Sequence, residues 1–175
     1  MRKEVLRAVR ESFRRKIESG GRFRHGDDRG APGSDIYVWK FSDDLNCFVY
    51  LLPSSKSYQD AFIVELGWSS GPSFPATARL QNKSRLDFQS DGRLRLPSLW
   101  REQWKSALEP WWELGRGLSV DLGNSFYSEE ETLRRVAKVP EAVADAIDKL
   151  EKYGIPFLHR VAEERHAARS SAPPS

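Results

Sequence analysis

Three side chains near the end of the sequence have the types and the spacing of a zinc site. His159, Glu163 and His166 fall at i, i+4 and i+7, which places them on one face of a helix. Imidazole nitrogens and carboxylate oxygens are common zinc ligands. The segment around them is highly charged and offers no apolar shell to shield a metal ion. We therefore interpret the three residues as the solvated end of a helix, and we predict no structural metal and no cofactor.

Two carboxylates, Asp44 and Glu65, are separated roughly as in a restriction-type nuclease. In such a site the carboxylates bind a metal ion, and the lysine of an acidic-x-Lys pattern supports the attacked phosphate. Gly67 occupies the lysine position. We therefore interpret Glu65 as an edge or rim residue of a sheet, and we assign no catalytic residue.

Other nucleophile and phosphate-binding patterns are missing from the sequence. Cys47 is the only cysteine, which excludes an internal disulfide and a cysteine zinc site, and its apolar neighbours favour an unreactive thiol. The Gly-rich segment lacks the GxxxxGK(S/T) pattern, and no serine stands in a GxSxG context. A divergent enzyme would need residues that meet only in the fold, such as Glu65 and Asp87 with an arginine in one pocket.

Positive charge is concentrated at the N-terminus. Residues 1–25 hold nine Lys or Arg against three Glu, whereas the remainder of the chain is slightly acidic. Three arginines at i, i+3 and i+7 would form a ridge that continues past the helix, and such a ridge can bind phosphates. The ridge comprises Arg7, Arg10, Arg14, Arg22 and Arg24. The alternative is a solvated helix face, partly neutralised by Glu4, Glu11 and Glu18.

Six tryptophans in 175 residues is a high content. Trp39 and Trp68 fall in apolar runs and are expected in the core. Adjacent Trp111 and Trp112 cannot both point the same way, so one of them is predicted to be exposed. Core packing is the default interpretation of the tryptophans, whereas an exposed tryptophan beside arginine would suit nucleobase stacking or a protein hot spot. The candidate contact residues are Trp104 and Trp112.

The elements that must position these side chains follow from hydrophobic periodicity. An apolar stripe of Val5, Val9 and Phe13 predicts a helix over 3–18. Apolar runs and alternating segments predict strands at 36–41, 47–52, 61–68, 84–89 and 93–97. A capping box at 128–131 begins a helix, Pro140 is predicted to begin another, and Gly154 with Pro156 to end it. Residues 98–116 are expected to be short helical or irregular structure.

Together these elements predict one α+β domain over residues 1–165. We expect an antiparallel sheet of about five strands packed against an N-terminal helix and two to three C-terminal helices. A mobile Gly-rich loop is expected at about 19–34 and a disordered tail at 166–175. No apolar run approaches the ~20 residues that span a bilayer, and the charged N-terminal segment is not expected to act as a secretory signal. With a single cysteine, these features predict a cytoplasmic protein without membrane contact.

Several short motifs resemble a bacterial family catalogued as domain of unknown function 4304. They are GGRF, AFIVELGW, the Arg-Leu of RLDF, PWWELG and YGIPFL, and the resemblance that they carry extends over most of the chain. The resemblance implies a first helix, a Gly-Phe loop, an aromatic meander, a Trp-containing segment and a final helix. It implies no catalytic residue, because the family has no established activity. A regulatory or immunity-type partner role is what the resemblance suggests for a small bacterial domain.

Our leading hypothesis is therefore a small, non-enzymatic cytoplasmic domain that acts by binding another protein. Aromatic and arginine residues, which interfaces favour, are abundant, and no complete catalytic motif is visible. The first alternative is a nucleic-acid-binding protein that uses the arginine ridge. The second alternative is a divergent enzyme with no motif visible in the sequence.

Overall fold

The computed structural model describes residues 2–26, 34–54, 59–81, 85–100, 112–116 and 128–170. The chain begins with α1 (Arg2–Ser19) and continues through β1 (Arg24–His25), β2 (Asp35–Ser42), β3 (Leu45–Pro53), β4 (Gln59–Ser69) and β5 (Gly92–Arg95). A short 3₁₀ helix (Leu96–Leu99) and β6 (Trp112–Arg116) follow. The chain then forms α2 (Glu129–Lys149), a π-helical turn (Leu150–Gly154) and α3 (Ile155–Ser170). The predicted α+β class is confirmed, with two C-terminal helices among the described residues.

The strands form one antiparallel sheet in the order β1-β2-β3-β4-β5. The predicted strands at 36–41, 47–52 and 61–68 correspond to β2, β3 and β4. One edge of the long β4 is shared by two partners: Phe62 lies opposite Trp112 of β6, and Glu65 lies opposite Arg95 of β5. β4 is therefore an interior strand along most of its length.

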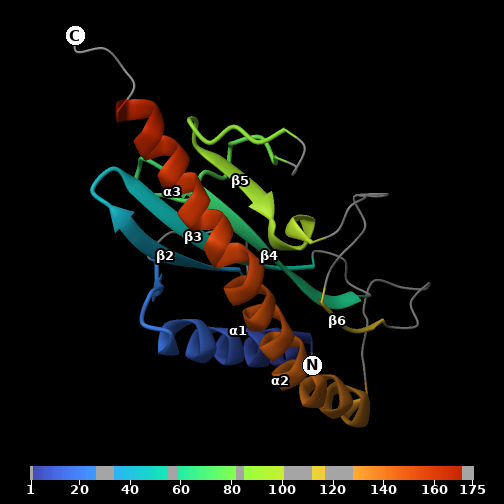
Figure 1. Ribbon diagram of the computed structural model, residues 1–175. Coiled ribbons are helices and arrows are strands. Elements are labelled where there is room, and N and C mark those ends of the chain that lie inside the picture. The colour runs from blue at the N-terminus through green and yellow to red at the C-terminus, as the bar shows by residue number, and fades with distance from the viewer. Residues whose placement is uncertain are drawn as a thin grey trace.

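The helices pack on one face of the sheet. Figure 1 shows α2, the π turn and α3 as one helical run across this face, with α1 beneath it. On α1, Val5, Val9 and Phe13 are buried at a spacing of four residues, as the apolar stripe predicts. They join the face of β4 that carries Phe62 and Trp68 in a single hydrophobic core. The opposite face has a smaller core of Ile36, Phe48, Tyr50 and Phe74.

A buried ion pair joins α2 to the sheet. Arg135 donates from Nη1 to Asp60 Oδ2 at 2.6 Å, and from Nη2 to Glu131 Oε1 at 2.6 Å. The side chains of Arg135 and Asp60 are only 4% and 0% exposed. Gly115 of β6 lets the guanidinium approach, because a Cβ there would lie 3.1 Å from Arg135 Cζ. The N-terminus of α2 is fixed as predicted: Ser128 Oγ accepts from the backbone N–H of Glu131.

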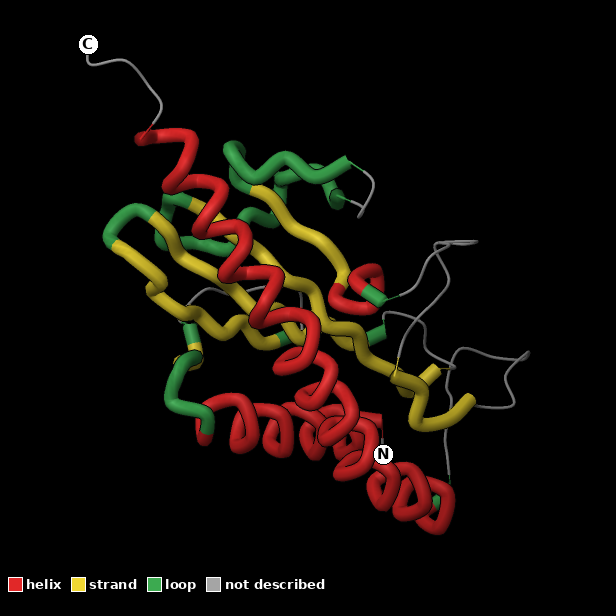
Figure 2. Tube along the Cα trace, viewed as in Figure 1, coloured by secondary structure: helices red, strands yellow, loops and turns green. Residues whose placement is uncertain are grey.

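The strand predicted at 84–89 is wrong for the residues that the structure describes there. Residues 85–91 form bends before β5, drawn as loop in Figure 2. The Gln81 side chain donates to the carbonyl of Asp87 and accepts from its N–H. The Asp87 carboxylate in turn accepts from the backbone N–H groups of Gln89 and Ser90. These local hydrogen bonds replace the strand ladder, and β5 pairs with β4 instead.

Two helix boundaries are also corrected. Pro140 lies inside α2 rather than at the start of a helix. Burial of Val139 and Val143 on the face toward the core offsets the one hydrogen bond that proline removes. Gly154 and Pro156 do not end the run: the π turn ends at Gly154, and α3 continues from Ile155 through Pro156, which has no N–H to donate. Gly154 is needed for packing: a Cβ there would lie 2.7 Å from Leu150 Cδ1.

The ends of the predicted domain also change. α3 continues to Ser170, so the boundary predicted at residue 165 falls inside an ordered helix. Val161 and Arg165 are buried and hold this part of the helix against the body. Residues 171–175 of the predicted tail lie outside the described residues. In the predicted Gly-rich loop, the described part contains β1, and Gly26 N–H donates to the Ile36 carbonyl at 2.8 Å. Residues 27–33 are not described.

Candidate ligand-binding groove

Four of the five arginines of the predicted ridge lie beside carboxylates of the same chain. Arg10 makes a bidentate contact with Asp35, with Nε at 3.0 Å from Oδ2 and Nη2 at 2.7 Å from Oδ1. The buried Asp35 also lies 3.4 Å from His25 Nε2. Burial alone would raise the pKa of Asp35, but hydrogen bonds and attraction from Arg10 and His25 hold it below its usual range. Arg10 therefore anchors α1 to β2.

The other ridge arginines divide between local pairs and the aromatic face. Arg7 pairs with Glu11 and Arg14 with Glu18 along α1. Arg22 lies 3.2 Å from Glu151 and places its guanidinium over the Trp39 ring, 5.4 Å from the centroid. Arg24 is exposed in β1. Because the carboxylates offset much of the ridge's charge, a bound phosphate would have to compete with them.

Trp112 is part of the internal packing. Its ring stacks on Phe62 at a centroid distance of 5.4 Å, and its Nε1 donates to Asp145 of α2 at 2.9 Å. Trp100 lies beside it at 6.5 Å. These contacts tie β6 to α2 and leave the indole partly exposed. The second predicted contact residue, Trp104, lies outside the described residues, as does Trp111.

Glu65 is not an edge or rim residue, because β5 covers that side of β4. Its side chain is 3% exposed and lies between Arg93, whose Nη1 is 3.2 Å away, and Arg95, whose Nε is 3.5 Å away. Asp87 does not join this group: its carboxylate holds the bends before β5. The structure thus gathers Glu65 with two arginines but places Asp87 elsewhere.

The side chains that do converge on a hollow come from the β2–β3 turn and from α3. Trp39 and Phe41 lie two residues apart on β2 and therefore share a face of the sheet. The ring of His159 on α3 meets both, at centroid distances of 5.3 Å from Trp39 and 5.2 Å from Phe41. The Trp39 and Phe41 rings lie 4.7 Å apart. Of this aromatic trio, Phe41 and His159 line the hollow, and Trp39 packs against both of them.

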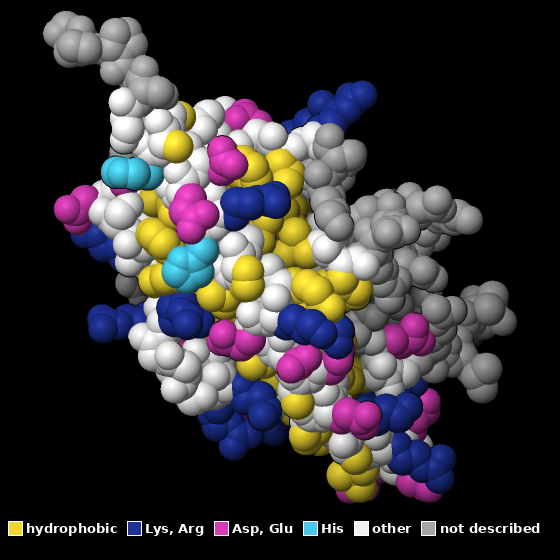
Figure 3. Space-filling view, in the orientation of Figure 1, with side chains coloured by type: hydrophobic (Ala, Val, Ile, Leu, Met, Phe, Trp, Pro, Cys, Tyr) yellow, Lys and Arg dark blue, Asp and Glu magenta, His cyan; other side chains and the backbone are white. Residues whose placement is uncertain are grey.

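We call this hollow the β2–α3 groove; its volume is about 340 Å³. Its lining combines apolar, acidic and imidazole side chains, namely Phe41, Ser42, Asp44, Leu45, His159, Ala162, Glu163, Arg165 and His166. Ser42 Oγ donates to Asp44 Oδ1 at 2.6 Å, which orients that carboxylate in the turn. In Figure 3 histidine, acidic and hydrophobic side chains lie side by side on this face of the molecule.

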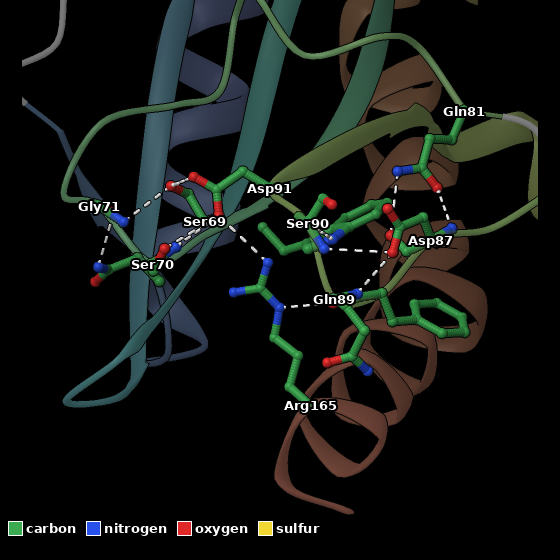
Figure 4. A network of polar contacts seen from close by, with 12 residues as sticks. Ser69, Ser70, Gly71, Gln81, Asp87, Gln89, Ser90, Asp91 and Arg165 are labelled. Atoms are coloured by element: carbon green, nitrogen blue, oxygen red, sulfur yellow. Dashed lines mark hydrogen bonds and ion pairs between the residues drawn. The ribbon is translucent and has the colours of Figure 1, made fainter. Parts of the chain in front are cut away.

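Arg165 fixes α3 beside the groove. Its Nε donates to the Phe88 carbonyl at 2.7 Å, and its Nη2 lies 3.3 Å from Asp91 Oδ1. Asp91 also accepts from Ser69 Oγ at 2.5 Å and from the Ser70 N–H at 2.9 Å (Figure 4). Although burial acts to raise it, these donors lower the pKa of Asp91 below its usual range. The charge of Arg165 is thus balanced by Asp91, and the wall it supports is held by a polar network.

The groove is not arranged as a metal centre. Among the described residues, no three His, Cys, Asp or Glu side chains converge as a metal ion requires. Cys47 lies in the core away from the groove lining, and burial raises the pKa of its thiol to about 12. Thiolate chemistry at neutral pH is therefore disfavoured at this residue.

Sequence reasoning found part of this site but interpreted it differently. The spacing of His159, Glu163 and His166 places them on one helical face, which the sequence alone predicts to be a solvated helix end. The structure supplies the apolar neighbours that this interpretation lacked, in Phe41, Leu45 and Ala162. The alternation of Trp39 and Phe41 along β2 was the available signal, but nothing in the sequence placed it beside α3.

The fold and the groove define an α+β domain with a helix-lined antiparallel sheet and a small, chemically mixed hollow at one end. Comparison of the chain with models of protein families, with curated proteins and with solved structures finds no match. The resemblance to domain of unknown function 4304 stays a prediction. None of the described helices is both long and apolar enough to cross a membrane.

Proposed function

We propose that this chain is a small, non-enzymatic cytoplasmic domain that binds another protein through the β2–α3 groove. The observation that carries the proposal is the pair of Phe41 and His159, which packs against Trp39 and lines a hollow of about 340 Å³. Protein interfaces concentrate their binding energy in aromatic anchors and pockets surrounded by polar groups. The polar side chains of Glu163 and His166 provide such a surrounding here.

We favour the groove over the arginine ridge as the binding surface, because the two surfaces differ in the internal contacts that a partner would have to break. Ridge arginines already contact carboxylates of the same chain, such as Asp35 and Glu151. A partner there must break internal ion pairs, whereas a partner at the groove adds contacts to side chains that face a hollow. The cluster of Glu65 with Arg93 and Arg95 supports stability more than catalysis, since the carboxylate is buried between its two cations.

A nuclease-treated pull-down with matched variants tests the proposal. Tagged wild type, Phe41→Ala, Glu163→Lys and Leu133→Ala would each be used as bait. Leu133 is a suitable control because it is 63% exposed on α2, outside the groove lining. We expect wild type and Leu133→Ala to retain one stoichiometric protein that both groove variants lose.

The two groove variants guard against different artefacts. Phe41→Ala removes an aromatic anchor that is partly packed on the core. Glu163→Lys changes only an exposed side chain. Thermal melting of each variant shows whether lost binding is lost folding. Retention of the same partner by both folded groove variants would refute the groove as the binding surface.

A further inference from the structure

We infer that the β2–α3 groove receives an arginine side chain of the partner protein. This inference rests on the proposed function and names the chemistry of the group that would enter. Three features of the groove point to the same occupant: its charge, its aromatic wall and its size.

The first feature is the charge of the lining. Carboxylates stand on both sides of the groove, Asp44 from the β2–β3 turn and Glu163 from α3. The one arginine of the lining, Arg165, is balanced by Asp91 and donates to the Phe88 carbonyl. The lining also holds the imidazoles of His159 and His166, but its carboxylates outnumber its arginine, so it favours a cationic group over an anionic one.

The second feature is the aromatic wall, which suits a planar cation. The same protein already places guanidinium groups on neighbouring rings. Arg22 lies over Trp39, which packs against Phe41 and His159 of the wall, and Arg160 of α3 lies over Phe88 at 5.1 Å and Phe157 at 5.7 Å. A guanidinium stacks on aromatic faces and bonds carboxylates in a fork, which an ammonium group cannot do. Arginine therefore fits the wall better than lysine.

The third feature is the size of the groove. A volume of about 340 Å³ lies at the lower end of the range for small-ligand pockets. It suits one long side chain, whose aliphatic stem can lie against Leu45 and Ala162 while its charged end reaches the carboxylates.

The test uses capped amino acids as probes in an NMR titration of the full chain. N-acetyl-arginine amide, N-acetyl-lysine amide and N-acetyl-citrulline amide would be added in turn, and backbone amide shifts followed. Citrulline keeps the shape of arginine but has no charge. We expect saturable shifts in residues 41–45 and 159–166 with the arginine probe, weaker binding of lysine, and roughly tenfold weaker binding of citrulline.

A pair of neighbouring variants provides the matched control. Glu163→Gln removes a carboxylate of the groove and should weaken the arginine probe about three- to fivefold, the range for a partly exposed ion pair. Glu164→Gln makes the same change one residue along α3, outside the lining, and should leave binding unchanged.

The inference is overturned if the arginine probe gives no saturable shifts at the groove, or if citrulline binds as tightly. It is also overturned if Glu163→Gln and Glu164→Gln behave alike. In each of these cases, a partner that wild type captures and Phe41→Ala loses would still support the proposed function. The two proposals can therefore fail separately.

Discussion

α1 and α3 both present charged side chains at helical spacing, but the surroundings of those charges differ. On α1, Arg10 is bound by Asp35 of β2, and Arg14 lies beside Glu18 of the same helix. On α3, His159 and Glu163 border a hollow of about 340 Å³ whose wall is aromatic. The charges of α1 chiefly stabilise the fold or one another. Those of α3 are placed where a ligand could meet them.

The contrast shows that the role of a charged side chain depends on where its partner lies. A charge paired within the fold stabilises the structure, whereas a charge beside a hollow can contact a ligand. A buried, paired charge becomes costly when its partner is removed, because the remaining group cannot be solvated. An exposed charge beside an apolar hollow costs little to remove for stability, but it changes what can bind. Variants at four places along this scale test the contrast.

The largest effect is expected at the buried extreme, Arg135 of α2. Arg135→Met leaves the fully buried Asp60 carboxylate without its main partner, and should lower the free energy of unfolding by about 3–5 kcal/mol. Arg134→Met is the matched control, since its pair with Glu130 is 75% exposed on both sides. We expect the control to change stability by less than about 0.5 kcal/mol. Urea denaturation measures both, and equal losses would contradict the contrast.

A smaller effect is expected at Asp35, which anchors α1. Asp35→Asn weakens the bidentate contact with Arg10 and should cost about 1–2 kcal/mol at pH 7. Because the folded state holds the pKa of Asp35 below its usual range, its contribution is complete above the unfolded carboxyl pKa of about 4. The contribution is lost as the pH falls through the folded pKa.

The difference between wild type and Asp35→Asn should therefore shrink on acidification. Urea midpoints at pH 7, pH 4 and pH 3 measure it. A difference that stays constant over this range would mean that Asp35 contributes through packing or its neutral form rather than through its charge.

Much of this fold could be predicted because its main signals are local. Alternating or continuous apolar residues predict β2, β3 and β4, and the spacing of Val5, Val9 and Phe13 predicts α1. Ser128 marks the start of α2, because its Oγ accepts a hydrogen bond from the backbone N–H of Glu131, three residues later. In these elements, propensity, pattern and capping agree with the tertiary structure.

The wrong predictions share a non-local or side-chain cause. Leu86 and Phe88 alternate like a strand, but Asp87 and Gln81 bend the chain there through side-chain hydrogen bonds. β6 is short, and its partner β4 is distant in the sequence. No local pattern therefore predicts this strand. Pro140 stays within α2 because its neighbours are buried against the core.

The candidate site was harder to predict than the fold for the same reason. Its walls come from residues 41–45 and 159–166, and only the tertiary structure brings them together. The partners of the arginine ridge are similarly distant: Arg22 meets Glu151, 129 residues away. Spacing within α3 identified which side chains share a face, but not what that face contacts.

The next effect should appear in binding rather than in stability. Glu163→Gln removes an exposed carboxylate of the groove, so the free energy of unfolding should change by less than about 0.5 kcal/mol. Binding of N-acetyl-arginine amide should nonetheless weaken, as measured by the NMR titration described above. A large loss of stability would place Glu163 with the structural charges of α1 and would remove the contrast between the two helices.

The smallest effect is expected on the arginine ridge. Arg7 and Arg14 already face Glu11 and Glu18, so wild type should elute early from heparin as salt is raised. The double variant Arg7→Glu with Arg14→Glu leaves Arg10 and its contact with Asp35 in place, and should elute at nearly the same salt concentration. Arg134→Glu, a single reversal on α2 that changes the net charge by half as much, controls for a reversal away from the ridge. Strong retention of wild type that only the ridge variant loses would instead identify α1 as a polyanion-binding surface and favour nucleic acid as the ligand.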